Sequence, residues 1–387
     1  MSRLLLPITA ALALAATALA QSSAPAKGAP AKPATSGKTP PAAKPAADET
    51  KPRPQQVFIV DMKGMVGAGL RHDEMEAVEK EADKYGPHQI IILKVDSGGG
   101  SVTEGDKISR TLSRIREKHR LVAWIKEAIS GAAFTSMHCP EIYFFTVGTM
   151  GSITKFSSNE SGQVSATGRD LEAWIERVAE VAEGGGRDPQ VGRAMVYSPI
   201  VCSYTKDPKT GKVTFYADGS GEVMLSDDKD NLTFTATTAM DCKYIQGVAD
   251  TEDDLFKAMQ LNPGTYEVNP AGKKVGETWQ KTLERSKKLA QEIQQDLQLV
   301  NGNDAAAINK RIKLYKQMQD VWRNAPPVAQ GMEGGGMLIP PEAENYASDL
   351  FEKFQTSPDQ SKVAIEVIDR CIKELQKQLA ASRKKGG

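Results

Sequence analysis

The chain has 387 residues, enough for one core domain with an appendage or for two domains. Its 49 lysines and arginines balance its 49 aspartates and glutamates, so no net charge attracts nucleic acid or another polyanion. We therefore expect no nucleic-acid partner.

The first twenty residues have the pattern of an export signal. Arg3 supplies the positive charge, Leu4 to Leu14 the short apolar stretch, and Ala18-Leu19-Ala20 the small residues before a cleavage site ahead of Gln21. No other segment approaches the roughly 18 apolar residues of a spanning helix. The first cysteine is Cys139, which argues against a lipoprotein anchor. The sequence predicts an exported protein, periplasmic or secreted.

Residues 21–56 are nearly all Ala, Pro, Lys, Ser, Gly and Thr, too few apolar side chains to form a core. We expect a disordered linker there, with binding to an anionic surface such as cell wall as the alternative.

Strand and helix patterns alternate after this linker. The expected elements are a strand at 57–62, a helix at 72–85, a strand at 89–95, a helix at 102–118, a strand at 121–125, a helix from 130 to about 138 and a strand at 142–146. This alternation predicts an α/β domain of βαβ units with a mostly parallel sheet.

The domain is expected to continue to about Leu261. A helix at 169–183 is followed by one or two inserted β-hairpins at about 197–231, a short helix through 244, a strand at 245–248 and a helix at 253–260.

From 277 to 387 the chain has helical periodicity. Apolar or small residues from Trp279 to Val300 recur at spacings of 4 and 3, as in a coiled-coil seam. This tail is interpreted as a small antiparallel bundle, either an assembly arm or a cap on its own domain.

The four cysteines are Cys139, Cys202, Cys242 and Cys371. An exported chain permits disulfides, and Cys202 with Cys242 is one pairing among several that the sequence leaves open. The cysteine spacings match no zinc motif, and we expect no metal and no cofactor.

Two short stretches indicate a catalytic site. Gly98, Gly99 and Gly100 follow the strand at 89–95 and allow a tight turn with exposed N–H groups. Ser130 lies where a helix should begin after the next strand, in the positive field of a helix N-terminus. Such a serine can be a nucleophile beside an oxyanion hole, or it can simply cap the helix.

Several segments in order resemble the ClpP-like serine peptidase superfamily (ClpP/crotonase-like fold), in particular the SppA and NfeD types. The matching stretches are Ser97-Gly98-Gly99-Gly100-Ser101-Val102, Ile129-Ser130-Gly131-Ala132-Ala133, Thr149-Met150-Gly151-Ser152-Ile153, Gly186-Arg187-Asp188-Pro189 and the run 232–261. In the first of them, Gly98 replaces the family's proline. The resemblance implies a spiral of βαβ units, with Ser130 as the nucleophile. It also implies the N–H groups of Gly100 and Gly131 as the oxyanion hole, with Gly99 holding the turn.

The general base departs from the family pattern. SppA and NfeD proteins use a lysine near the helix that here begins at about Arg169, but no lysine lies between Phe156 and Thr205. Arginine stays protonated and cannot take the proton of a serine. Lys155, which follows the strand end that resembles the SppA segment, is the candidate base. His138 is eight residues beyond Ser130, which along a continuous helix corresponds to roughly 12 Å and is too far.

Three functions follow as hypotheses. The first is a serine peptidase that cleaves unfolded or membrane-derived polypeptides with Ser130 and Lys155. The second is a catalytically impaired relative that binds extended peptides, and the third is an oligomeric scaffold joined by the helical tail. An acyl-CoA enzyme of the crotonase type shares the fold, but export removes it from that substrate. The expected partners are a peptide or protein substrate and further copies of the chain, and a membrane-associated partner is left open.

Overall fold

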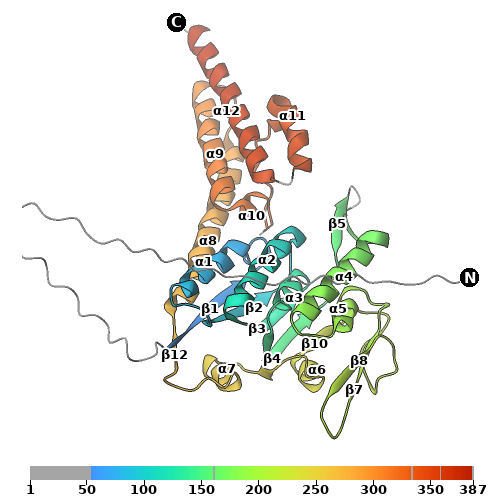
Figure 1. Ribbon diagram of the computed structural model, residues 1–387. Coiled ribbons are helices and arrows are strands. Elements are labelled where there is room, and N and C mark those ends of the chain that lie inside the picture. The colour runs from blue at the N-terminus through green and yellow to red at the C-terminus, as the bar shows by residue number, and fades with distance from the viewer. Residues whose placement is uncertain (1–53, 160–161, 333, 358, 386–387) are drawn as a thin grey trace, which may run out of the picture. The chain divides into compact units, whose positions relative to one another are not determined.

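The computed structural model describes residues 54–385 with the exception of 160, 161, 333 and 358 (Figure 1). The expected export signal, and the linker up to residue 53, lie outside the described residues. Within this part of the chain, no helix has both the length and the apolar character needed to cross a membrane.

A seven-stranded sheet forms the centre of the α/β domain. Its strands follow the order β10-β4-β3-β2-β1-β12, and β11 also pairs with β4. All pairs are parallel except β10 with β4. The strands are β1 (Gln55–Lys63), β2 (Ile90–Ser97), β3 (Arg120–Ile129), β4 (Glu141–Gly151), β10 (Thr233–Thr235), β11 (Gly247–Val248) and β12 (Tyr266–Val268). The predicted α/β class with a mostly parallel sheet is confirmed.

Alternate residues of the central strands pack into two different cores, as expected for a sheet buried on both faces. Phe58 and Val60 of β1 belong to the larger core, whereas Val57 and Ile59 belong to the smaller one. The larger core contains α1 (His72–Asp83), α2 (Val102–Lys118), α3 (Gly131–Ser136), α4 (Gly168–Gly184) and α5 (Pro189–Val196). The smaller core is covered by α7 (Glu252–Ala258).

Several elements were not predicted or differ from the prediction. A hairpin of β5 (Phe156–Asn159) and β6 (Gly162–Ser165), the helix α5, and the strand β12 have no counterpart in the expected list. The insertion at 197–231 contains a predicted hairpin, and a third antiparallel strand adds to it. Its central strand β7 (Cys202–Lys206) pairs with both β8 (Val213–Tyr216) and β9 (Val223–Ser226). The expected helix through Tyr244 is the shorter α6 (Ala236–Asp241).

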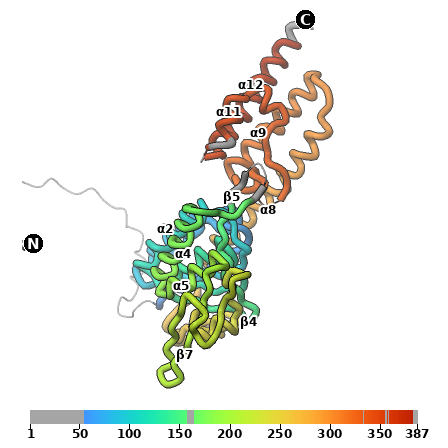
Figure 2. The backbone as a smooth tube through the Cα atoms, turned by 90° about the vertical axis from the view of Figure 1, so that its right-hand side faces the viewer, coloured from blue at the N-terminus to red at the C-terminus, as the bar shows by residue number. Residues whose placement is uncertain are grey.

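The tail is helical, as predicted. It consists of α8 (Pro270–Leu299), α9 (Ala305–Asn324), the short α10 (Pro326–Ala329), α11 (Ala343–Thr356) and α12 (Gln360–Lys385). Helix α9 contacts both α8 and α12, and the three run side by side in both views (Figures 1 and 2). Leu283 and Ile293 of the predicted seam are buried in the core of this bundle.

The sheet and the tail meet at β1. The amino-terminal part of α8 packs on this strand so closely that a Cβ on Gly272 would lie 2.8 Å from the backbone N of Ile59.

The four cysteines are all buried free thiols, so the considered Cys202–Cys242 disulfide is not formed in this structure.

Candidate functional site

The register of the parallel strands brings three chain segments together at one edge of the sheet. Ser97 at the end of β2 is opposite Ala128 of β3, and Ile129 at the end of β3 is opposite Gly151 of β4. The glycine turn after β2, Ser130 after β3 and Ser152 after β4 therefore leave the sheet side by side. The carboxyl edge of parallel strands is where α/β folds place their sites.

Ser130 has an unusual backbone conformation. It joins β3 directly to α3 with φ 55° and ψ −122°. A residue with a Cβ pays about 1–3 kcal/mol for such a conformation, which persists only where the surroundings enforce it. Here its N–H donates to Gly151 O at 2.9 Å, and its carbonyl accepts from Phe134 N at 3.0 Å. The turn resembles the sharp strand-to-helix turn that presents the nucleophilic serine in α/β-hydrolases.

The side chain of Ser130 does not cap α3. No hydrogen bond joins its hydroxyl to the first turn of that helix, although Ser130 is the N-cap residue. The alternative that this serine is only a helix cap is therefore not realised. The hydroxyl is half-buried, and none of the hydrogen bonds among the described residues involves it.

The turn after β2 lies directly on Ser130 and requires glycine at two positions. Gly99 has φ 100°, and a Cβ on it would lie 2.6 Å from the Cβ of Ser130. Gly100 has φ 150°, and its Cβ would lie 2.4 Å from Val66 O. Side chains are excluded from both positions by the backbone conformation and by contact.

Two backbone N–H groups are available beside Ser130. Val66 N donates to Gly99 O and Ser101 N donates to Val66 O, both at 2.9 Å, so the N–H of Gly100 between them faces away from Val66. The position of a Cβ on Gly131 is 3.4 Å from Gly100 N. Gly131 is the first residue of α3, where an N–H has no partner within the helix. Neither N–H donates a hydrogen bond among the described residues, so both can bind a developing oxyanion.

Lys155 is held by another residue. It follows β4, and its Nζ lies 2.5 Å from Oδ1 of Asp170 in the first turn of α4 and 6.0 Å from the ring centroid of Trp174. Its side chain is 25% exposed. None of the hydrogen bonds among the described residues joins it to Ser130. Arg169 is the neighbouring residue on α4 and is exposed.

His138 is excluded for a different reason from the one that the sequence suggested. Helix α3 ends at Ser136, so no continuous helix joins Ser130 to His138. The imidazole is buried against α2, where its Nε2 lies 2.6 Å from Ser109 Oγ. Burial lowers the pKa of His138 to about 3, and the positive charges of Arg116 and Arg177 add to the effect.

Sequence reasoning missed two parts of this site. Val66 holds the glycine turn through both of its backbone groups, yet only the glycines on either side of it mark a loop in the sequence. Ser152 has φ 50°, and its N–H donates to Leu232 O at 3.0 Å. Asn231, the last residue of the insertion, donates from Nδ2 to Thr154 Oγ1 at 2.7 Å. The insertion thus fastens the segment between β4 and Lys155.

Comparison with known proteins finds similar proteins for this part of the chain. Residues 56–231 match the family model described as the N-terminal domain of NfeD1b. The protein named "Putative protease slr0021" from Synechocystis sp. is 28% identical over 125 residues, which are 32% of this chain and 41% of that protein. The match thus spans about two fifths of the relative's length.

Two solved structures of the 1510-N membrane-bound stomatin-specific protease, both of single-residue mutants, also match. One is 13% identical, covering 53% of this chain and 85% of that chain with a TM-score of 0.41. The other, in complex with a substrate peptide, is 15% identical, covering 56% and 91% with a TM-score of 0.42. Residues 56–231 of this chain are therefore similar to the N-terminal domain of NfeD1b, which agrees with the NfeD-type resemblance of their sequence motifs.

Proposed function

We propose that this protein is a serine peptidase in which Ser130 is the nucleophile. The observation that carries the proposal is the strained backbone of Ser130, whose hydroxyl makes no capping bond, beside two N–H groups without acceptors. A fold has no structural need to hold a serine at positive φ, and such strain is concentrated at functional sites.

The reaction follows from these positions. Ser130 Oγ attacks the carbonyl carbon of a peptide bond, and the N–H groups of Gly100 and Gly131 bind the oxygen as it becomes negative. Each such donor contributes about 3–4 kcal/mol to the stabilisation of the transition state. The leaving amine takes a proton, and water then hydrolyses the acyl-serine.

Lys155 is the proposed base, and its ion pair with Asp170 must break before it can accept a proton. An ammonium group has no lone pair, so Nζ accepts the serine proton only as a neutral amine that has left the carboxylate. Lys155 lies on the segment that continues from Gly151, whose carbonyl accepts the N–H of Ser130. Substrate binding at this edge is the step that we propose releases Nζ from Asp170.

The substrate is proposed to be an extended or unfolded polypeptide. The export signal expected at residues 1–20 supports a location outside the cytoplasm, where membrane-derived and unfolded exported chains are available. Assembly of several copies through the tail stays a prediction.

Labelling with a fluorescent fluorophosphonate tests the proposal. Wild-type protein should be labelled, whereas Ser130→Ala and Lys155→Arg should not. Ser165→Ala, at an exposed serine on β6, and Arg169→Ala should label like the wild type. Equal labelling of the wild type and Ser130→Ala would refute the assignment. Peptide binding by a wild type that is not labelled would instead support the catalytically impaired alternative.

A further inference from the structure

We propose that the tail helix α8 positions the oxyanion-binding turn of the α/β domain, and that Trp279 is the positioning residue. The inference rests on the proposed peptidase function for its effect on the reaction. The contacts that carry it are independent of that function.

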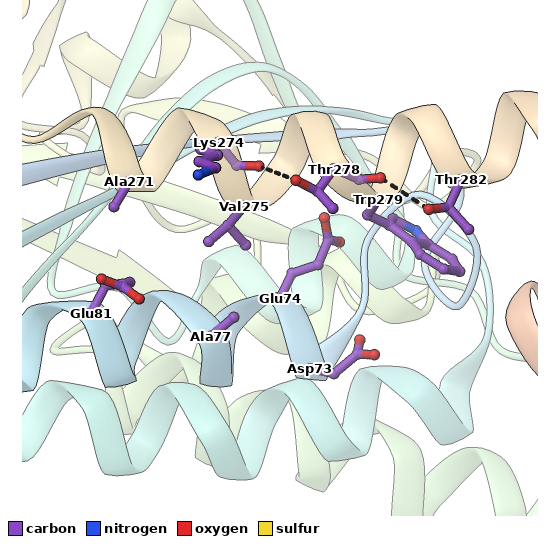
Figure 3. Close-up of a pocket in the computed structure, with 10 residues that line it drawn as sticks. All are labelled: Asp73, Glu74, Ala77, Glu81, Ala271, Lys274, Val275, Thr278, Trp279 and Thr282. Carbon is purple, nitrogen blue, oxygen red and sulfur yellow. Dashed lines mark hydrogen bonds between the residues drawn. The ribbon is translucent and has the colours of Figure 1, made fainter.

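The first contact joins α8 to the loop between β1 and α1. The indole Nε1 of Trp279 donates to Ala68 O at 2.6 Å. The guanidinium carbon of Arg71 lies 4.0 Å from the centroid of the same ring, so the indole contacts two positions of the loop. Trp279 extends from α8 towards this loop at the end of the groove between α1 and α8 (Figure 3). Gln280 Nε2 adds a bond to Lys63 O at 3.3 Å.

The loop is compact enough to transmit a displacement. Met65 O accepts hydrogen bonds from the N–H groups of Ala68, Gly69 and Leu70, at 2.9, 2.7 and 3.0 Å. A Cβ on Gly69 would lie only 1.8 Å from Lys63 O, so the two ends of the loop are in contact. A shift at Ala68 therefore also moves Val66, two residues earlier in the same loop.

The second contact joins this loop to the glycine turn. Val66 is fully buried and binds Gly99 and Ser101 through its own N–H and carbonyl. These two bonds set the direction of the Gly100 N–H, which is the oxyanion donor. Met332, after α10, also contacts the loop, because its Cε is 3.3 Å from the position of a Cβ on Gly67. The tail thus contacts the loop from two of its segments.

The seating of α8 does not depend on Trp279. Gly272 and Gly276 place the helix against the backbone of β1, where their Cβ positions would lie 2.8 Å from Ile59 N and 3.0 Å from Asp61 O. Trp279→Phe therefore removes the bond to Ala68 O while it leaves the helix and the aromatic contact with Arg71 in place.

Trp322→Phe is the matched control. The indole Nε1 of Trp322 also donates to a backbone carbonyl, that of Leu338 at 2.7 Å, and Trp322 is fully buried within the bundle. The control removes the same kind of bond at a residue that does not belong to the loop contacts described above.

Two measurements test the inference. With the fluorophosphonate probe, Trp279→Phe should lower the maximal labelling rate about tenfold and leave the affinity for the probe unchanged. The effect is smaller than the 10²–10³-fold loss of rate on deletion of an oxyanion donor, because the donor is displaced and not removed. Hydrogen exchange at the amides of Val66 and Ser101 should also accelerate. Trp322→Phe should change neither.

The two measurements separate the inference from the proposed function. If the wild type is labelled and Trp279→Phe is labelled equally fast with unchanged exchange, the inference is wrong while the peptidase stands. If the wild type is not labelled, the peptidase proposal fails and the exchange at Val66 and Ser101 still decides whether α8 holds the turn. Acceleration spread evenly over all strands of the sheet would overturn the inference, because it would show a general loss of stability.

Discussion

The buried carboxyl group of Glu74 should contribute a stabilisation that is lost as the pH rises. Glu74 lies on α1 and points towards α8, beside a cavity of about 460 Å³ (Figure 3). The residue is 5% exposed, and neither side-chain oxygen has a hydrogen-bond partner among the described residues. Burial raises the pKa of Glu74 from 4.5 to about 8, and the neighbouring charge of Asp73 adds to the shift.

The sign follows from proton binding. The folded state holds the proton of Glu74 more tightly than the unfolded state. The stabilisation is therefore fully present below pH 4.5 and is lost as the pH rises to 8. Each pH unit in this window lowers the contribution of Glu74 to the free energy of unfolding by about 1.4 kcal/mol. Between pH 5 and pH 8 the loss amounts to about 3 to 4 kcal/mol.

Urea unfolding of the wild type and of Glu74→Gln at pH 5 and pH 8 measures this loss. The neutral amide has the same shape and does not ionise, so its advantage over the wild type should grow by that amount between the two pH values. Glu81→Gln is the control, because Glu81 lines the same cavity but is paired with Lys84. An advantage of Glu74→Gln that is the same at both pH values would refute the reasoning.

Three further predictions concern the site. Ser130→Gly should be more stable than Ser130→Ala by about 1 kcal/mol in thermal unfolding, because glycine tolerates φ 55°; equal stabilities would show that Ser130 is not strained. Gly100→Ala should abolish fluorophosphonate labelling, because the added Cβ would lie 2.4 Å from Val66 O. Gly98→Ala should keep the labelling, since the atom nearest to its Cβ would be 3.5 Å away. Loss of labelling in both variants would contradict the specific role of Gly100. Asp170→Asn should raise the labelling rate at pH 8 several-fold, because it removes the carboxylate that holds Lys155; an unchanged rate would argue against Lys155 as the base.

Local sequence signals were enough to predict several elements of the fold. The helix at 102–118 has the bounds that its apolar spacing predicted, and in the structure Ser101 caps it. The glycine turn and Ser130 were recognisable from a few neighbouring residues each. Three consecutive glycines follow one strand, and Ser130 lies between the next strand and a helix. The parallel sheet followed from the alternation of strands and helices, since that order leaves few ways to bury both faces.

The tertiary structure decided the features that depend on residues far apart in the chain. The strand β12 lies beyond the expected end of the domain at Leu261 and exists because it pairs with β1. The pairing of β4 with β3 and β10 carries it to Gly151, five residues past its apolar run. Lys155 follows the strand end that resembles the SppA segment, but the fold places Asp170 beside it.

The bond from Trp279 to Ala68 spans 211 positions, and no local pattern predicts it. Periodicity in the tail marks Trp279 only as a member of a helical seam, because spacing identifies a face of a helix and not what that face contacts. The sequence thus identified a candidate nucleophile and the turn beside it. Only the packing of α8 on β1 shows that Trp279 contacts the loop beside that turn.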